Sequence, residues 1–170
     1  MLHESYYMYN WVETTHVLSL MLSLGMLFFI DLRMLGIALP KVPATIIARR
    51  LRLPMFIGFG LMIITGLLLF YAIPVRSAQS VWFRIKLLLL LGAGVNALVF
   101  HYRMKQSVAS WDSAPQAPQN IRSGALLSLL FWTSIVICGR LIAYDWYDCS
   151  REQSGLVSVF AGCIEGQVQF

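Results

Sequence analysis

The stretch VWFRIKLLLLLGAGVNALV, residues 81–99, decides the fold class of this chain. Its five consecutive leucines, at positions 87–91, exclude the alternating pattern that a membrane β-barrel strand requires. A run of about 20 apolar residues is long enough for a helix to cross about 30 Å of hydrocarbon. Because a chain in lipid must satisfy its backbone hydrogen bonds internally, the stretch predicts a transmembrane helix.

Three further apolar blocks surround this one, and the composition agrees with them. The chain of 170 residues is 58% hydrophobic and only 12% charged, whereas soluble domains carry roughly a quarter of charged residues. Because Glu4 and Glu13 flank the first block and no Lys or Arg precedes it, we expect an uncleaved span there, not a signal peptide. The sequence therefore predicts an all-α integral membrane four-helix bundle in a single domain, with helices at about 11–33, 53–73, 81–104 and 122–145 and a tail at 146–170.

The distribution of Lys and Arg predicts the orientation. The first and third connections are rich in basic residues, namely Arg33, Lys41, Arg49, Arg50 and Arg52 in the first and Arg103, Lys105 and Arg122 in the third. The N-terminal tail has none. The positive-inside rule then places these two connections in the cytoplasm and both termini outside, in the periplasm if the membrane is a bacterial inner membrane. The net charge of +5 then reflects topology and contact with anionic lipid, and no nucleic-acid partner is expected.

The tail carries two cysteines and several aromatic residues on the predicted outer side. Cys149 and Cys163 flank a stretch that contains glycine. They form either a disulfide, which would persist in the periplasm, or two unrelated thiols. Trp146 and Tyr147, together with Trp11 and Trp82, are typical of an aromatic belt at the outer interface. We expect the tail to dock on the bundle or on a partner.

Three ionisable residues within the spans need a physical reason, because charge is costly in hydrocarbon. His16 shares a helix face with Ser19 and Ser23, and it is either a helix-bonding histidine or a metal or haem ligand. Lys86 begins the third helix on the same outer side, as an interfacial anchor or as a partner of His16. Arg140 either snorkels to phosphate headgroups or binds a cofactor carboxylate such as a haem propionate.

Other features of the spans have plainer interpretations. His101 lies at the opposite end of the third helix, so it cannot share one haem iron with His16. Asn96 is expected to hydrogen-bond across the bundle. Five glycines permit close helix contact or leave room for a flat ligand; they are Gly58, Gly60, Gly66, Gly92 and Gly94. The eight methionines are scattered, which favours core filling over a copper site.

The motifs resemble a known group of membrane proteins over about residues 11–104. These motifs are Trp11-x-x-x-x-His16 ending in Asp31-Leu-Arg33, Arg50-Leu51-Arg52 leading to Thr65-Gly66, and Trp82-Phe-Arg84-Ile-Lys86 running to Asn96. They are similar to the first three helices of the copper-resistance CopD proteins and the HemJ-type protoporphyrinogen oxidases. The chain also resembles small bacterial membrane proteins grouped under domain-of-unknown-function names.

The resemblance to the HemJ-type proteins implies b-type haem, with His16 and Lys86 in the positions of the haem-associated His and Lys. Neutral imidazole is a good iron ligand, whereas Lys ligates only when burial deprotonates its amine. The enzyme activity does not carry over, because the flanking pattern and the tail differ. The resemblance to CopD implies copper handling instead.

Three functions therefore remain as hypotheses. The first is a small b-type haem-binding protein for electron transfer, possibly a subunit of a larger redox complex, with His16 as axial ligand and Arg140 as propionate partner. The second is a cofactor-free accessory subunit that packs against other membrane subunits, and the third is copper handling. An electron-transfer or accessory role is favoured over a stand-alone enzyme.

Overall fold

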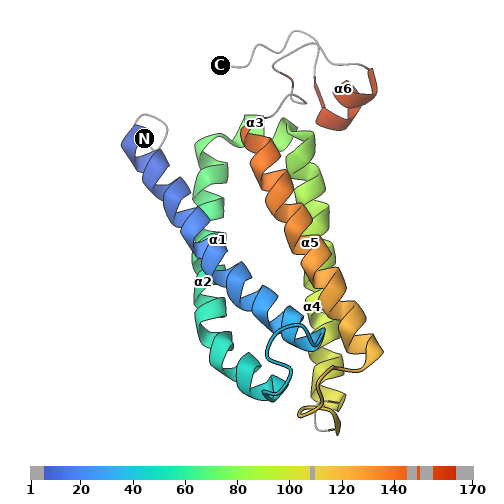
Figure 1. Ribbon diagram of the computed structural model, residues 1–170. Helices are drawn as coiled ribbons and strands as arrows, with labels where there is room; N and C mark the ends of the chain where they lie inside the picture. The colour runs from blue at the N-terminus through green and yellow to red at the C-terminus, as the bar shows by residue number, and fades with distance from the viewer. Residues whose placement is uncertain (1–5, 108–109, 145–148, 150–154, 164–170) are drawn as a thin grey trace.

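The computed structural model describes residues 6–107, 110–144, 149 and 155–163, and within these all regular structure is helical. The expected all-α class is thereby confirmed. The helices are α1 (Tyr6–Met34), α2 (Ala44–Ala72), α3 (Pro74–Gln79), α4 (Val81–Ser107), α5 (Gln119–Ala143) and α6 (Gly155–Ala161) (Figure 1).

Four of these helices, α1, α2, α4 and α5, are long and apolar enough to cross a membrane. The shortest, α5, has 25 residues, which corresponds to a length of about 38 Å. Large apolar side chains point outward along them. Leu88, Leu91 and Leu98 of α4 are 69%, 69% and 72% exposed, which is the pattern of a surface that contacts lipid. By length and composition, the chain is a multi-pass membrane protein.

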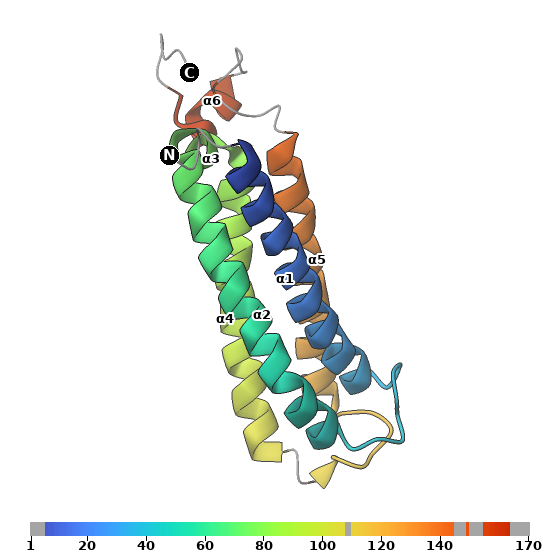
Figure 2. The ribbon, with the colours of Figure 1, turned by 90° about the vertical axis from the view of Figure 1, so that its left-hand side faces the viewer.

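The four long helices run side by side as two helical hairpins (Figure 2). α1 packs along α2, and α4 packs along α5, while the hairpins meet mainly through α1 and α5. Toward its N-terminal end α1 leans away from α5 (Figure 1). The N-terminal end of α1 and the C-terminal end of α5 lie at the same end of the molecule, as an even number of crossings requires.

The opposite end is closed by an apolar cluster and by a buried arginine. The cluster contains Ile30, Met34, Ala44, Ile47, Trp111, Ala117, Ile121 and Ala125. Arg33 is fully buried and donates hydrogen bonds to the carbonyl oxygens of Val42 (2.7 Å), Ala114 (3.0 Å) and Pro115 (3.3 Å). Arg33 therefore ties both connections at this end together.

The long helices extend beyond the apolar runs that predicted them. The largest difference is at α2, which begins at Ala44 although the sequence predicted 53, so that Pro54 lies inside the helix. The Asp112 carboxylate accepts hydrogen bonds from the backbone N–H of Thr45 (2.8 Å) and from its hydroxyl (2.6 Å). A carboxylate at a helix N-terminus satisfies free backbone donors and favours the helix dipole. This distant residue stabilises the early start.

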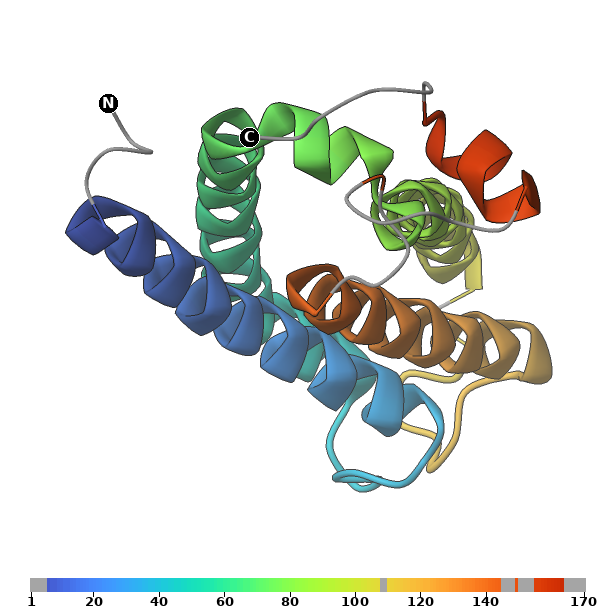
Figure 3. The same cartoon turned by 90° about the horizontal axis from the view of Figure 1, so that it is seen from above.

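The described part of the tail contacts α4 through α6. Arg84 donates hydrogen bonds to the carbonyl oxygens of Phe160 and Ala161 at the end of α6, and also to that of Ala78 at the end of α3. A disulfide joins Cys149 to Cys163, with 5.4 Å between their Cα atoms. Seen from above, α6 lies beside α4 and far from α1 (Figure 3). Trp146 and Tyr147, predicted in the aromatic belt, lie outside the described residues.

Candidate functional site

A partly enclosed cavity of about 600 Å³ lies between the two hairpins, in the half where α1 leans away from α5. Its volume is within the range of about 300–1,000 Å³ that is typical of small-molecule sites. Most of its walls are apolar, and its lining includes His16 of α1, Lys86 of α4 and Arg140 of α5. The structure therefore brings together around one cavity all three ionisable residues that the sequence singled out.

His16 is held by a residue of the neighbouring helix. Its Nδ1 lies 2.9 Å from the hydroxyl oxygen of Thr65 in α2, and that hydroxyl lies 2.7 Å from the carbonyl oxygen of Leu61. Because the Thr65 hydroxyl has one proton, which it donates to Leu61, we assign the remaining contact as Nδ1–H of His16 donating to Thr65. In this tautomer Nε2 carries the free lone pair, which makes it the nitrogen able to bind a metal.

Two glycines of the cavity lining, Gly66 and Gly139, lie next to basic side chains. A Cβ atom added at Gly66 would lie 3.2 Å from Cε1 of His16, which is closer than ordinary van der Waals contact. A Cβ atom at Gly139 would lie 3.5 Å from Nζ of Lys86, which is an ordinary contact distance. Gly66 is therefore needed for the observed position of the imidazole ring, whereas a Cβ atom at position 139 would fit beside the ammonium group.

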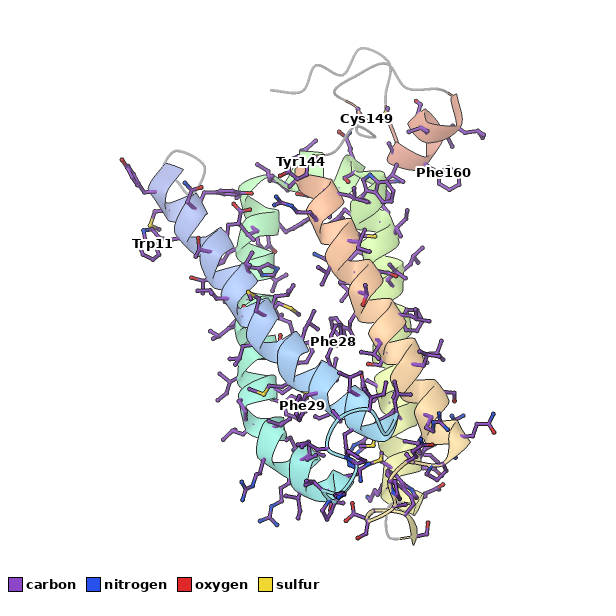
Figure 4. All side chains as sticks on the ribbon, viewed as in Figure 1. Trp11, Phe28, Phe29, Tyr144, Cys149 and Phe160 are labelled. Atoms are coloured by element: carbon purple, nitrogen blue, oxygen red, sulfur yellow. A yellow bond between two sulfur atoms is a disulfide. The ribbon has the colours of Figure 1, made fainter. Side chains whose placement is uncertain are left out.

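Lys86 and Arg140 differ in how they are held. Lys86 is half-buried, and among the described residues no group forms a hydrogen bond or ion pair with its Nζ. Arg140 donates a hydrogen bond to the hydroxyl of Tyr144 (2.6 Å), and its guanidinium lies 4.7 Å from the centre of that ring. Tyr144 stands at the end of α5 nearest the tail (Figure 4). Tyr144 thus holds the Arg140 guanidinium, which forms no other hydrogen bond or ion pair within the described residues.

The lining favours an anionic amphiphile. Lys86 and Arg140 supply two positive charges, whereas Glu13 is the one acidic side chain in the lining of this cavity, and it is exposed. Lys86 and His16 both line this cavity. A ligand with an apolar body and carboxylate or phosphate groups would bury its body between the hairpins and place its charges on the two basic residues.

The side chains around the cavity can supply few ligands to a metal ion. A metal bound there would need most of its ligands from the molecule that carries it. Within the described part of the chain, no group of three or more His, Cys, Asp or Glu side chains could hold a metal ion. The cavity lining offers a metal at most one imidazole, that of His16, and one amine, that of Lys86.

The other sequence candidates lie elsewhere. His101 is exposed near the opposite end of α4, as expected. Asn96 of α4 donates to the carbonyl oxygen of Gly124 in α5 (3.0 Å), which is the expected bond across the helices. The interpretation of Gly60 and Gly94 as close-contact glycines is wrong. Nothing lies within 4 Å of a Cβ added at either one, so each has open space beside it.

Sequence reasoning missed the residues that lie next to His16, Lys86 and Arg140. Thr65 was noticed only as part of the Thr65-Gly66 motif, and no role was given to Tyr144 or Gly139. The available signal was the pair Thr65-Gly66 itself, since a threonine followed by a glycine inside an apolar helix supplies a hydroxyl beside an open space. Thr65 is 7% exposed, and such a buried hydroxyl needs a partner.

The fold and this site define a class, namely a four-span helical membrane protein with a basic, mostly apolar cavity between two hairpins. Comparison with known proteins gives the family: the chain belongs to the "Family of unknown function (DUF6644)", which matches residues 5–145 and thus all four long helices. No curated protein and no solved structure matches the chain.

Proposed function

We propose that this protein binds a b-type haem in the cavity between the hairpins and serves electron transfer, as a subunit of a larger membrane redox complex. The observation that carries this proposal is the 2.9 Å contact between Nδ1 of His16 and the Thr65 hydroxyl, which in the assigned tautomer leaves Nε2 of a cavity-lining imidazole as the free nitrogen. Metal-binding histidines almost always donate their other ring N–H to a fixed acceptor.

Each of the other residues has a role in this arrangement. Lys86 would hold the iron or one carboxylate of the haem, and Arg140, which donates to Tyr144, would hold the other carboxylate. The apolar walls exclude water from the macrocycle. A bound haem supplies one-electron redox chemistry, and the chain's own residues bind it, orient it and neutralise its carboxylates.

The proposal includes a location in the bacterial inner membrane with both termini in the periplasm. The basic residues of the two connections at the Arg33 end support this orientation. The disulfide between Cys149 and Cys163 supports it as well, because disulfides persist in oxidising compartments.

The test is the reduced-minus-oxidised visible spectrum of the detergent-purified protein, expressed with ample haem. We expect b-type bands in the wild type and their loss in His16→Ala. The matched control is His101→Ala, which removes an exposed histidine far from the cavity and should keep the bands. Equal size-exclusion profiles would show that all three proteins are folded.

Two results would contradict the proposal. One is a folded wild-type protein without colour, which would favour the cofactor-free accessory role. The other is a spectrum that His16→Ala leaves unchanged, which would place any haem away from this cavity.

A further inference from the structure

A second unusual group lies far along α1 from the cavity. Asp31 stands one turn before the end of α1 and is only 2% exposed. Its Oδ2 atom has no hydrogen-bond partner among the described residues. Ser128 of α5, itself buried, interacts with the carboxyl group, and α1 packs against α5, so Asp31 lies where the two hairpins meet.

The arginine nearest in sequence does not neutralise Asp31. Arg33 directs its N–H groups at four carbonyl oxygens of the connections, those of Val42, Asp112, Ala114 and Pro115. No ion pair joins it to Asp31. The positive charge of Arg33 is therefore engaged by backbone dipoles.

The other packed elements also leave Asp31 unpaired. Each has charged residues near this end, and none of them forms an ion pair with Asp31 within the described residues. The charged residues of α2 near this end are Arg49, Arg50 and Arg52, and all are exposed. On α5 the charged residue is Arg122, which is half-buried. On α4 the titratable residues are His101, Arg103 and Lys105, and all are exposed. In the connections Lys41 is exposed, and Asp112 accepts its bonds from Thr45.

An ionised carboxylate in this place would be very costly. Transfer of an unpaired charge into a low-dielectric interior costs far more than transfer of a neutral hydrogen-bonding group, and ionisable groups in membrane spans usually mark functional sites. Adding a proton removes the charge and leaves a neutral acid that needs fewer partners.

We propose that Asp31 is a proton-binding site at the interface between α1 and α5, occupied by a proton at neutral pH while that interface is closed. Loss of this proton requires water or a cation to reach the carboxylate, and therefore requires α1 and α5 to separate. Proton binding and closure of the interface are then coupled. This proposal is independent of what the cavity holds.

The test is infrared spectroscopy of the detergent-purified protein at neutral pH. We expect a carboxylic-acid C=O band in the wild type that shifts in D₂O and is lost in Asp31→Asn. The matched control is Glu13→Gln, which changes an exposed carboxylate and should keep the band. Absence of the band from the wild type, or its persistence in folded Asp31→Asn, would overturn the proposal.

Thermal unfolding gives a second, independent measurement. Asn resembles the neutral acid in shape and charge, so Asp31→Asn should unfold at or above the wild-type Tm at neutral pH. Between about pH 5 and pH 8 the wild-type Tm should fall as pH rises, because unfolding lets Asp31 ionise, and the variant should lack this slope. A wild-type Tm well above that of the variant at neutral pH would mean that Asp31 is an ionised partner, and would contradict proton binding.

Discussion

At the scale of single residues, the position of His16 depends on one hydroxyl. In the assigned tautomer, Thr65 accepts from Nδ1 of His16 while it donates to the carbonyl oxygen of Leu61. We expect Thr65→Val, which keeps the shape but removes the acceptor, to weaken haem binding by about 10–100-fold, as is typical for the loss of a group that orients a metal ligand. Haem titration of the apoprotein in detergent measures this effect.

Thr65→Ser is the control for that substitution, because it keeps the hydroxyl and should bind haem nearly as the wild type does. If the valine and serine variants bind equally well, the hydroxyl does not orient His16.

Gly66 allows the second prediction at this scale. Gly66→Ala places a Cβ atom 3.2 Å from Cε1 of His16, so the ring must move by a few tenths of an ångström away from α2. We expect a lower haem content and a shifted absorption spectrum. Gly60→Ala is the matched control, since nothing lies within 4 Å of its added Cβ. Identical spectra of the two variants would contradict a tight fit at Gly66.

At the scale of elements, the connections at one end of the molecule depend on Arg33. Its hydrogen bonds to carbonyls of both connections satisfy acceptors that are far apart in sequence. We expect Arg33→Lys to lower the free energy of unfolding by about 3 kcal/mol or more, because one ammonium group cannot reach the carbonyls that a guanidinium reaches. Thermal unfolding in detergent measures the loss.

The control for Arg33→Lys is Arg49→Lys, which changes an exposed arginine of α2 and should unfold as the wild type does. Equal stability of the two variants would show that the Arg33 network contributes little.

The helical elements themselves could be predicted from apolar length, but their ends and partners could not. Apolar runs such as the leucines at 87–91 predict that a helix crosses lipid. The start of α2, in contrast, depends on Asp112, which lies in the connection between α4 and α5. Arg33 looked like an ordinary basic residue of a connection, and its burial depends on carbonyls more than 80 positions away in sequence. Long-range bonds of this kind leave no periodic signal.

The candidate site was more predictable than the helix ends. Ionisable residues are rare within spans, because placing a charge in hydrocarbon costs free energy. His16, Lys86 and Arg140 could therefore be selected from the sequence. The supporting residues could not, because threonine and glycine occur in spans for many reasons. Asp31 was noticed only within a motif, since its burial depends on how α1 crosses α5.

At the scale of the whole molecule, the orientation predicts which cysteines a reagent can reach. If the tail lies in the periplasm, as proposed, a membrane-impermeant thiol reagent should label Cys149 and Cys163 in intact cells with permeable outer membranes, and only after reduction of the disulfide. Cys138 is buried in α5 and should stay unlabelled. Mass spectrometry of the labelled protein identifies the sites.

The single-cysteine variant Cys149→Ser is the control for this experiment, because its Cys163 should react without reduction. Labelling of the tail only after the inner membrane is opened would reverse the orientation.

The arrangement in two hairpins also determines when, during synthesis, the cavity can form. The α1–α2 hairpin leaves the ribosome first, yet the cavity takes its walls from both hairpins. His16 is therefore synthesised long before Arg140, and no cavity exists until the second hairpin has entered the membrane and packed against α1. Any molecule that fills the cavity must be loaded after translation is nearly complete, so a shortage of that molecule would leave an inserted, empty protein in the membrane and would not block its synthesis.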